Sequence, residues 1–448
     1  MNRLKHLVAD LPEDVKKLVT YGDFKRANKL IGIYMDRNIS IMLKERLDFE
    51  RHRMEILKKE YIYTYDDALK MAQEKIKDFT KEELDNLKDQ RYADWIYIDG
   101  KVMFHLMFLE NISKVSKQRL INQDNNDKRS MLLDEIVDDM IEKGEKRYFI
   151  HVKTGVKLKK EGSRINETVR VHLPIPQNAI QIRNIKILNT SHKPKVISLE
   201  TYPQRTIYFE EKVKGEDVFT VEYSYENHVK YTELDYEKVS DVQPKFYTEE
   251  WLPHIAFTPF LVDLAKEIVG NETNPLRKAR KIYDYITKNV QYSYVRPYVA
   301  ILSIPEYAAY NLKGDCGVQA LLFITLCRIA GIPARWQSGL YVNPYSIGCH
   351  DWAQFYVEPY GWLFADLSFG GSAYRNNNGK RWNFYFGNLD PFRMVANSAF
   401  QYEFLPKKNF LRSDPYDNQI GEVEYLDEAV YSGDEFESIK EIIDIHEI

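Results

Sequence analysis

The sequence predicts an α+β protein built from more than one domain. At 448 residues the chain is too long for one ordinary hydrophobic core. Apolar residues follow helical spacing in the first third of the chain, short alternating runs follow, and helices then alternate with strands. We therefore expect a mainly helical region over 1–143, a small β-sandwich over 146–232, a mixed catalytic domain over 245–405 and an acidic tail over 421–448.

Local signals predict several elements of the first region. Thr80 and Glu83 form a capping box, which predicts that a helix starts between them. Trp95–Ile98 and Lys101–Phe104 flank an Asp-Gly dipeptide, a pattern typical of a tight hairpin. The other elements expected here are helices over 106–120 and 131–143 and a surface loop over 123–129.

The hydrophobic period changes between residues 147 and 231. Short runs such as Val169–Leu173 and Val218–Tyr223 are separated by turn residues, including Pro174 and Gly215. Several short strands at these intervals favour a small β-sandwich. A charged linker over 232–243 should join it to the next domain.

Composition argues against several classes of function. The 63 basic and 67 acidic residues are spread along most of the chain and nearly balance, which gives no electrostatic case for binding nucleic acid or a membrane surface. No apolar stretch has the length of a spanning helix, and the first residues lack a signal peptide, so we expect a cytoplasmic protein. The tail has ten acidic residues and one lysine, and we expect a solvated, partly disordered end, with a basic binding partner as the alternative.

The three cysteines indicate chemistry more than a disulfide framework, because they are odd in number and lack the paired spacing of metal ligands. Cys327 lies within an apolar helix and fits a core residue, and Cys349 is also expected to pack. Cys316 stands at the first turn of the helix that ends before Gly331. The unpaired amides of a first turn favour a thiolate, which is the nucleophilic form of the side chain.

A base for this thiol is available at His350, the one histidine between Cys316 and the acidic tail. His350 begins an alternating run that predicts a strand, and Trp362–Leu367 predicts the return strand after a turn. A cysteine at a helix start, with a histidine and Asp366 on two paired strands, is one arrangement of a thiol acyl-transfer triad.

Several motifs around these residues occur in a characteristic order. They are Gly-Asp-Cys-Gly at 314–317, Gly-Ile-Pro-Ala-Arg at 331–335, His350 with Trp352, Gly361-Trp362, Asp366, the preceding segment 265–294 and the closing segment 386–393. This order resembles the transglutaminase-like superfamily of papain-like thiol enzymes, over about 253–402. The resemblance implies a papain-like transglutaminase core in which Cys316 is the nucleophile, His350 the general base and Asp366 the residue that orients the imidazole. Bacterial members often carry a β domain ahead of this core.

Other site residues follow less directly. A three-residue turn puts His350, Gln354 and Asp366 on one face of the hairpin but sets Asp366 across from Gln354, so a bulge or another strand pairing is required, with Asp351 as a substitute. The backbone amide of Cys316 is one oxyanion donor. The second donor is expected from Gln291 or Tyr294, and Trp352 and Trp362 are expected as walls of the cleft or as core.

These residues predict a thiol hydrolase or acyltransferase that acts on peptide or carboxamide bonds of a peptide or protein substrate. Hydrolysis by a cysteine peptidase or amidase is favoured over a protein-glutamine transglutaminase, because bacterial proteins that the chain resembles are frequently described as cysteine proteases. A non-catalytic interaction scaffold is the alternative from another class. No cofactor and no metal is required by this chemistry, and no nucleotide-binding glycine pattern occurs.

Overall fold

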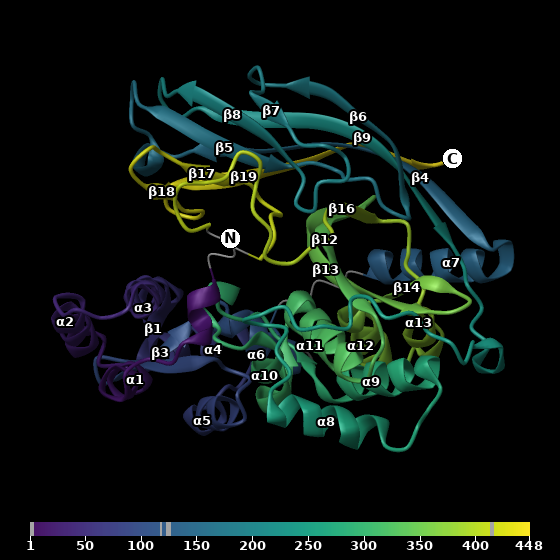
Figure 1. Cartoon of the computed structure of the whole chain (residues 1–448), viewed down its shortest axis with the longest axis horizontal. Helices are drawn as coiled ribbons and strands as arrows, with labels where there is room; N and C mark the ends of the chain where they lie inside the picture. The colour runs from purple at the N-terminus through teal and green to yellow at the C-terminus, as the bar shows by residue number, and fades with distance from the viewer. Residues whose placement is uncertain (1–3, 117–118, 122–126, 413–415) are drawn as a thin grey trace.

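The structure is a computed structural model that describes residues 4–116, 119–121, 127–412 and 416–448. It has the α+β class expected from the sequence, with three parts that are visible in Figure 1. A helical region lies at the lower left, a two-sheet β structure lies across the top, and a mixed core of helices and strands lies at the lower right.

The helical region combines short helices with a small sheet of order β1-β3-β2. Its elements are η1 (Lys5–Val8), α1 (Glu13–Thr20), α2 (Phe24–Met35), α3 (Ile41–Glu60), β1 (Tyr61–Thr64), α4 (Tyr65–Lys75), α5 (Lys81–Asp89), β2 (Trp95–Ile98), β3 (Lys101–His105) and α6 (Phe108–Val115). The helix α7 (Asp127–Lys143) belongs to another part of the molecule and packs beside the core (Figure 1).

Two local predictions for this region are confirmed. Thr80 Oγ1 accepts a hydrogen bond from the Glu83 amide at 3.2 Å, and α5 begins at the next residue after Thr80. In the hairpin, Ile98 pairs with Lys101, and the two turn residues have positive φ, as a type I′ turn requires. The helix expected over 106–120 is shorter, since α6 ends at Val115, and most of the loop expected over 123–129 lies outside the described residues.

The β structure consists of two sheets, of order β18-β17-β5-β8-β7 and β19-β4-β9-β6. Its elements are β4 (Glu145–Leu158), η3 (Lys160–Gly162), β5 (Thr168–Pro174), β6 (Ile182–Thr190), β7 (Val196–Ile197), β8 (Thr206–Lys212), β9 (Val218–Lys230), β17 (Glu422–Glu424), β18 (Ala429–Val430) and β19 (Phe436–Glu447). Val152 and Val156 of β4 share one buried cluster with Val169 and Val171 of β5, so the two sheets pack through their inner faces.

The acidic tail is folded, which corrects the expectation of a solvated end. Strand β19 pairs with β4 from Phe436, opposite Leu158, to Glu447, opposite Tyr148. Its acidic residues face solvent, whereas Phe436 is fully buried. Charge alone suggested disorder, but a strand with one solvated face tolerates charges there. The sandwich therefore combines strands from residues 145–230 with strands from the C-terminal end of the chain.

The core is built on a sheet of order β15-β14-β13-β12-β16, and helix α11 packs against β12 and β13. Its elements are η4 (Tyr236–Lys238), α8 (Pro259–Val269), α9 (Pro275–Asn289), β10 (Gln291–Tyr292), η5 (Tyr298–Ala300), α10 (Ile304–Asn311), β11 (Lys313–Gly314), α11 (Cys316–Ile329), β12 (Ala334–Asn343), β13 (Ser346–Val357), β14 (Gly361–Ala365), α12 (Leu367–Arg375), α13 (Gly379–Phe384), β15 (Phe386–Gly387) and β16 (Arg393–Asn397).

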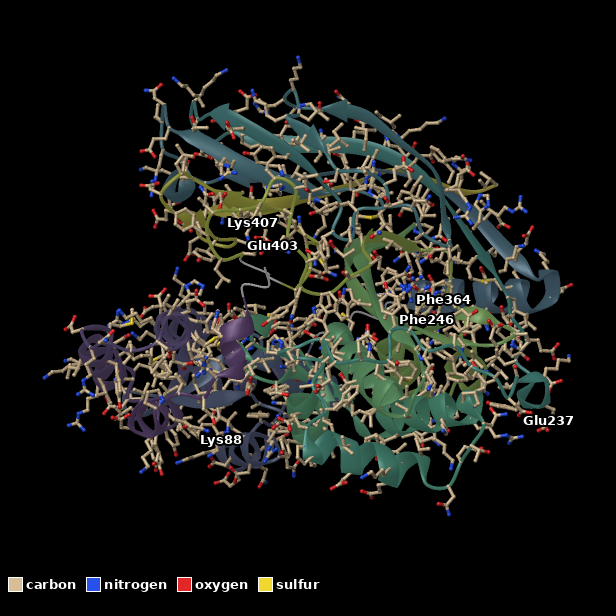
Figure 2. The ribbon with its side chains drawn as sticks, viewed as in Figure 1. Lys88, Glu237, Phe246, Phe364, Glu403 and Lys407 are labelled. Atoms are coloured by element: carbon tan, nitrogen blue, oxygen red, sulfur yellow. The ribbon has the colours of Figure 1, made fainter. Side chains whose placement is uncertain are left out.

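Between β16 and β17 the chain passes from the core back to the sandwich. Glu403 and Lys407 of this connection form an ion pair of 3.1 Å at the lower edge of the sandwich (Figure 2). In the described part of the chain, none of the helices combines the length and the apolar character needed to cross a bilayer.

Truncating the buried end of β19 should destabilise the sandwich. Because Phe436 is fully buried, Phe436→Ala should lower the free energy of unfolding by about 3–5 kcal/mol. Urea unfolding followed by circular dichroism measures the change. The matched control is Ile443→Ala on the same strand, where the side chain is 44% exposed and a loss below about 1 kcal/mol is expected. Equal losses in the two variants would contradict the anchoring role of Phe436.

Candidate active site

Cys316 is the first residue of α11, and the residues around it hold the helix start in place. Asp315 is the N-cap residue, and its Oδ1 accepts hydrogen bonds from the Val318 amide at 3.1 Å and from the Tyr298 hydroxyl at 2.5 Å. Gly317 leaves no room for a side chain, because a Cβ there would lie 2.2 Å from the Tyr298 hydroxyl and 2.7 Å from Asp351 Oδ2. The thiol of Cys316 is half-buried at this first turn.

The strand β13 places His350 and Asp351 on opposite faces of the core sheet. It pairs with β12 without a bulge, from Ala334 opposite Phe355 to Asn343 opposite Ser346. In such a strand successive side chains point to opposite faces. Asp351 therefore faces the start of α11, and His350 faces the other side.

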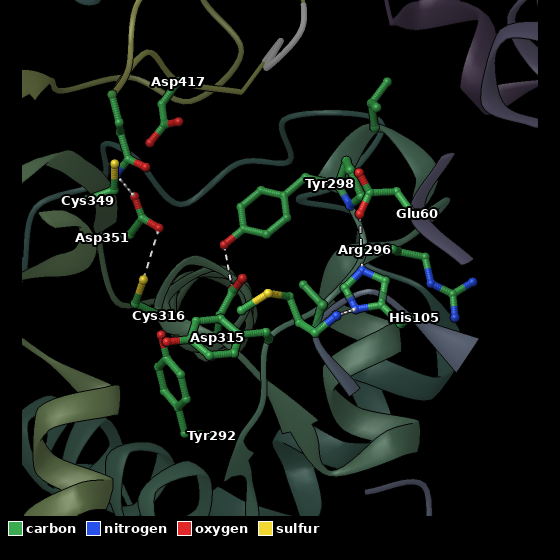
Figure 3. A pocket seen from close by; sticks show the side chains of 16 residues that line it. Glu60, His105, Tyr292, Arg296, Tyr298, Asp315, Cys316, Cys349, Asp351 and Asp417 are labelled. Atoms are coloured by element: carbon green, nitrogen blue, oxygen red, sulfur yellow. Dashed lines mark hydrogen bonds and ion pairs between the residues drawn. The ribbon is translucent and has the colours of Figure 1, made fainter. Parts of the chain in front are cut away.

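The thiol of Cys316 meets a carboxylate. Its Sγ donates a hydrogen bond to Asp351 Oδ2 at 3.2 Å, drawn as a dashed line in Figure 3. Burial raises the pKa of the Cys316 thiol well above its usual value, and the negative charges of Asp351 and Asp315 raise it further. Burial and the two carboxylates therefore oppose the effect of the helix-start amides, on which the expected thiolate depends.

His350 pairs with Asp366, as the triad motif suggested, but it is hydrogen-bonded to that carboxylate and not to the thiol. His350 Nε2 lies 2.7 Å from Asp366 Oδ2, and both side chains are buried. Burial lowers the pKa of the His350 imidazole, and the Asp366 charge offsets part of that effect. Burial would raise the pKa of Asp366, but the charges of His350 and Arg393 hold it well below its usual value.

The hairpin reaches this contact without a bulge, through the second expected alternative, another strand pairing. Val357 pairs with Gly361 and Ala353 with Ala365, so the turn lies one residue earlier than expected. Asp366 follows directly after β14 and would continue the ladder opposite Trp352, two residues from His350 and on the same face. Its Oδ1 also accepts the Phe369 amide at 2.9 Å and so caps α12.

Arg393 completes a buried ionic network that sequence reasoning missed. Its Nη2 lies 2.6 Å from Asp366 Oδ2, and its Nη1 lies 3.1 Å from Asp390 Oδ1. The Tyr385 hydroxyl donates to Asp390 Oδ2 at 3.0 Å. The signal was present in the closing segment 386–393, which contains both Asp390 and Arg393, although its chemistry is not evident from a linear motif.

Cys316 opens into a cavity of about 350 Å³, near the lower end of the range of about 300–1,000 Å³ that is usual for ligand sites. Figure 3 shows the side chains around it. The lining residues come from three parts of the chain and are Glu60, His105 and Met107, then Tyr292, Tyr294, Val295, Arg296, Pro297, Tyr298, Val299, Asp315, Cys316, Cys349 and Asp351, and finally Asp417 and Gln419. His350 does not line this cavity, so in this conformation the expected triad is divided between two faces of β13.

The helical region holds the loop that forms one wall of the cavity. Asn111 of α6 donates from Nδ2 to the Tyr294 carbonyl at 2.9 Å and accepts the Tyr294 amide at 2.8 Å. Asp94 lies 3.2 Å from Arg296 Nη2, and Arg53 donates to the Ala300 carbonyl at 3.2 Å. These contacts join elements far apart in the sequence, so the wall could not be inferred from local patterns.

The remaining candidates are placed as follows. Of the two residues expected to supply a second oxyanion donor, Tyr294 lines the cavity and Gln291 does not. Trp352 is fully buried beside His350, with ring centroids 6.0 Å apart, and donates from Nε1 to Gln337 Oε1. Trp362 lies away from the cavity. The guanidinium of Arg335 lies over its ring, with Cζ 3.9 Å from the ring centroid.

The other cysteines differ in exposure. Cys327 is fully buried in α11, whereas Cys349 is exposed and lies 3.3 Å from Lys440 Nζ. Within the described residues, no group of three or more His, Cys, Asp or Glu side chains could hold a metal ion.

Comparison with known families identifies the core. Residues 262–367 match the model of the transglutaminase-like superfamily. The chain therefore contains a transglutaminase-like domain. The matched segment includes Cys316, His350 and Asp366 and ends before Arg393. The match covers the segment whose motifs resemble the transglutaminase-like superfamily.

The individual relatives of this chain are distant. An uncharacterized protein of Haemophilus influenzae is 28% identical over 158 residues, which span 30% of this chain and 43% of the relative, less than half of its length. A protein of Cytophaga hutchinsonii that is proposed to be a cysteine protease has a TM-score of 0.44 and 14% identity, over 67% of this chain and 91% of its own.

The periplasmic domain of TgpA from Pseudomonas aeruginosa has a TM-score of 0.29 and 13% identity, over 52% of this chain and 92% of its own. The family assignment is based on the sequence match, since both structural scores are below 0.5.

Alkylation should show the protonated state of Cys316. With its pKa raised, iodoacetamide should modify Cys316 slowly at pH 7, and the rate should keep rising above pH 9. Asp351→Asn removes the negative charge nearest to the thiol, so the pKa of Cys316 should fall. The rate of alkylation at pH 7 should then rise about tenfold for each unit by which this pKa falls. Peptide mass spectrometry measures the rate at each cysteine, and Asp263→Asn, which is remote and exposed, is the control. Fast modification of the unchanged protein below pH 7 would contradict this assignment.

Breaking the buried network behind β13 should cost stability. Arg393→Met leaves Asp366 and Asp390 buried without their cation, and a loss of about 3–5 kcal/mol in the free energy of unfolding is expected. Arg277→Met is the control, because its ion pair with Glu237 is exposed and should contribute only about 0–1 kcal/mol. Both values come from urea unfolding, and a similar small loss in both variants would refute the structural role of Arg393.

Proposed function

We propose that the chain is a thiol-dependent acyl-transfer enzyme that acts on peptide or carboxamide bonds through Cys316. The observation that carries this proposal is the position of Cys316 Sγ at the first turn of α11, where it opens to a cavity and donates a hydrogen bond of 3.2 Å to the carboxylate of Asp351. The transglutaminase-like match supports the same thiol chemistry.

In the proposed reaction, Cys316 Sγ attacks the carbonyl carbon of the substrate while the thiol proton passes to Asp351. The developing oxyanion is stabilised by the free amides at the start of α11. The carbonyl then re-forms, the C–N bond breaks, and the leaving amine takes the proton back from Asp351. Water or a second amine attacks the thioester and regenerates the thiol.

The triad of Cys316, His350 and Asp366 stays a prediction and is the second version of this mechanism. It requires the imidazole to reach the face of β13 that carries Asp351, and a local bulge in the strand would allow this. In the structure as it stands, the His350–Asp366–Arg393 network acts as a buried support behind the strand.

Hydrolysis by a peptidase or amidase is favoured over transamidation, on the family resemblance alone. A protein-glutamine transglutaminase is the alternative, and products formed with and without an added primary amine distinguish the two. A cytoplasmic location also stays a prediction.

A scaffold without catalysis is the candidate from another class. The observations that favour it are the raised pKa of Cys316 and the imidazole on the far side of the strand. The triad version of the mechanism would have to move the imidazole, and a raised thiol pKa slows any attack by Cys316, whereas a scaffold is affected by neither.

Trapping the acyl-enzyme tests the proposal. Incubation with peptide and glutamine-donor libraries, followed by mass spectrometry, should give an adduct on Cys316 that is lost in Cys316→Ala and kept in Cys349→Ala. Asp351→Asn should slow adduct formation at least tenfold if Asp351 accepts the proton, with His350→Gln less affected. The opposite order would assign the base to His350, and the absence of an adduct with every library would favour the scaffold.

A further inference from the structure

We infer that Gln419 is a positioning residue of the active site, which acts on the Cys316 thiol through the Asp351 carboxylate. Its catalytic meaning rests on the proposed function, but the interaction can be measured on the resting protein without turnover. Gln419 lies on the connection between β16 and β17, outside the segment that matches the transglutaminase-like model. This connection is therefore a functional part of the site.

The carboxamide of Gln419 binds two consecutive residues of β13. Its Nε2 donates to Asp351 Oδ1 at 2.7 Å and to the His350 carbonyl at 3.1 Å. A carbonyl and an ionised carboxylate can only accept, so the nitrogen end of the carboxamide faces them and both of its N–H groups are used. The other oxygen of the same carboxylate, Asp351 Oδ2, accepts the Cys316 thiol at 3.2 Å. The carboxylate therefore links the glutamine to the thiol, and Figure 3 shows Asp351 between Cys316 and Asp417 of the same connection.

Asp351 has little freedom to leave this position. Its side chain is buried, and Oδ2 lies against Gly317, where a Cβ would be only 2.7 Å away. The ladder between β13 and β14 stops short of His350 and Asp351, which are paired with β12 alone among the described strands. The carboxamide of Gln419 therefore restrains the strand where it has a single neighbour. It holds the two residues whose exchange would bring the imidazole to the side of the thiol.

The backbone before Gln419 is fixed by other parts of the fold. The three preceding carbonyl groups each accept a hydrogen bond from a buried side chain. The pairs are Tyr416 with Gln204 Nε2 at 2.6 Å, Asp417 with Arg412 Nη2 at 2.6 Å and Asn418 with Asn397 Nδ2 at 3.1 Å. Asn397 is the last residue of β16 and Gln204 precedes β8, so the core and the sandwich both hold this segment. The carboxamide is therefore in place before a substrate binds.

The hydrogen bond from Gln419 takes up part of the negative charge of Asp351, because an N–H group that donates to a carboxylate stabilises its charged form. Gln419 thus weakens the effect of this charge on the thiol and leaves Oδ2 as the oxygen that faces the thiol proton. When Asp351 takes that proton in the proposed reaction, Oδ1 still accepts the amide, so the carboxyl group does not have to turn. The proton passes to the leaving amine from the same oxygen, and Gln419 keeps both of its own protons throughout.

Alkylation of Cys316 across pH tests this role. Gln419→Met removes both donors and nearly keeps the length of the side chain. The charge of Asp351 should then act more strongly on the thiol, so the rate with iodoacetamide at about pH 8 should fall about threefold or more, and the pH–rate profile should shift to higher pH. Peptide mass spectrometry separates Cys316 from the other cysteines. An unchanged profile, or one shifted to lower pH, overturns the inference.

A double-mutant cycle locates the effect at Asp351. In an Asp351→Asn background there is no carboxylate for the amide to act on, so Gln419→Met should change the rate less than about 1.5-fold. Gln419→Lys keeps a donor and adds a positive charge, so with Asp351 present it should shift the profile to lower pH. A glutamine that only holds the connection in place predicts neither result, because a loosened connection exposes the thiol equally in both backgrounds. Equal effects in the two backgrounds, or the same shift in both Gln419 variants, contradict the assignment.

The other charged and titratable groups around the cavity are common to these variants, so their effects cancel in the comparison. They are Asp315, Asp417, Glu60 with His105, Arg296 and Lys313 with Asp94, Lys114, Lys440, Tyr292, Tyr294 and Tyr298. Gln243→Met is the matched control, because this half-buried glutamine donates to the Ser240 carbonyl at 2.8 Å and lies outside the cavity wall. It should leave the profile unchanged, and a melting curve checks the folding of each variant.

The same measurements separate this inference from the proposed function. If the cycle shows coupling while no acyl-enzyme forms with any library, the proposed function fails and the action of Gln419 through Asp351 stands. If an acyl-enzyme forms on Cys316 and the two substitutions act additively, the proposed function stands and this inference fails.

Discussion

The two-residue period of β13 determines which side chain meets Cys316. Hydrogen bonds with β12 on one side and β14 on the other fix the register of this strand. A slip by one residue would move Trp352 and Gln354, both fully buried, to the opposite face. The pairing of Cys316 with Asp351 is therefore a consequence of the whole sheet and not of one local contact. Only a local bulge in β13 could bring His350 to the face that carries Asp351 without unpacking the core.

The two faces of β13 differ in their electrostatic environment. Behind the strand, Asp366 is hydrogen-bonded to His350 and paired with the cation of Arg393, so its charge is compensated although it is buried. In front of the strand, Cys316 faces two carboxylates, and a neutral thiol is the stable form.

Local patterns predicted the elements but not the face on which each side chain lies. The capping residue Thr80, the helix that begins at Cys316 and the hairpin that carries His350 and Asp366 each follow from signals within about twenty residues. The choice between His350 and Asp351 required the position of α11 relative to the sheet. The folding of the acidic tail depends on a partner strand, β4, that lies nearly 300 residues away in the sequence. A count of charges does not reveal such a partner.

Part of the cavity wall comes from outside the transglutaminase-like segment, namely from Glu60, His105, Met107, Asp417 and Gln419. Asn111 forms two hydrogen bonds with the backbone of Tyr294, and Glu60 of the same helical region lines the cavity. A motif that supplies the nucleophile therefore does not define the substrate, because some of the residues that line the cavity come from additions to the core. Because these hydrogen bonds hold the loop in place before binding, the loop loses less conformational entropy when a substrate binds than a free loop would. The helical region is for this reason part of the site and not an appended module.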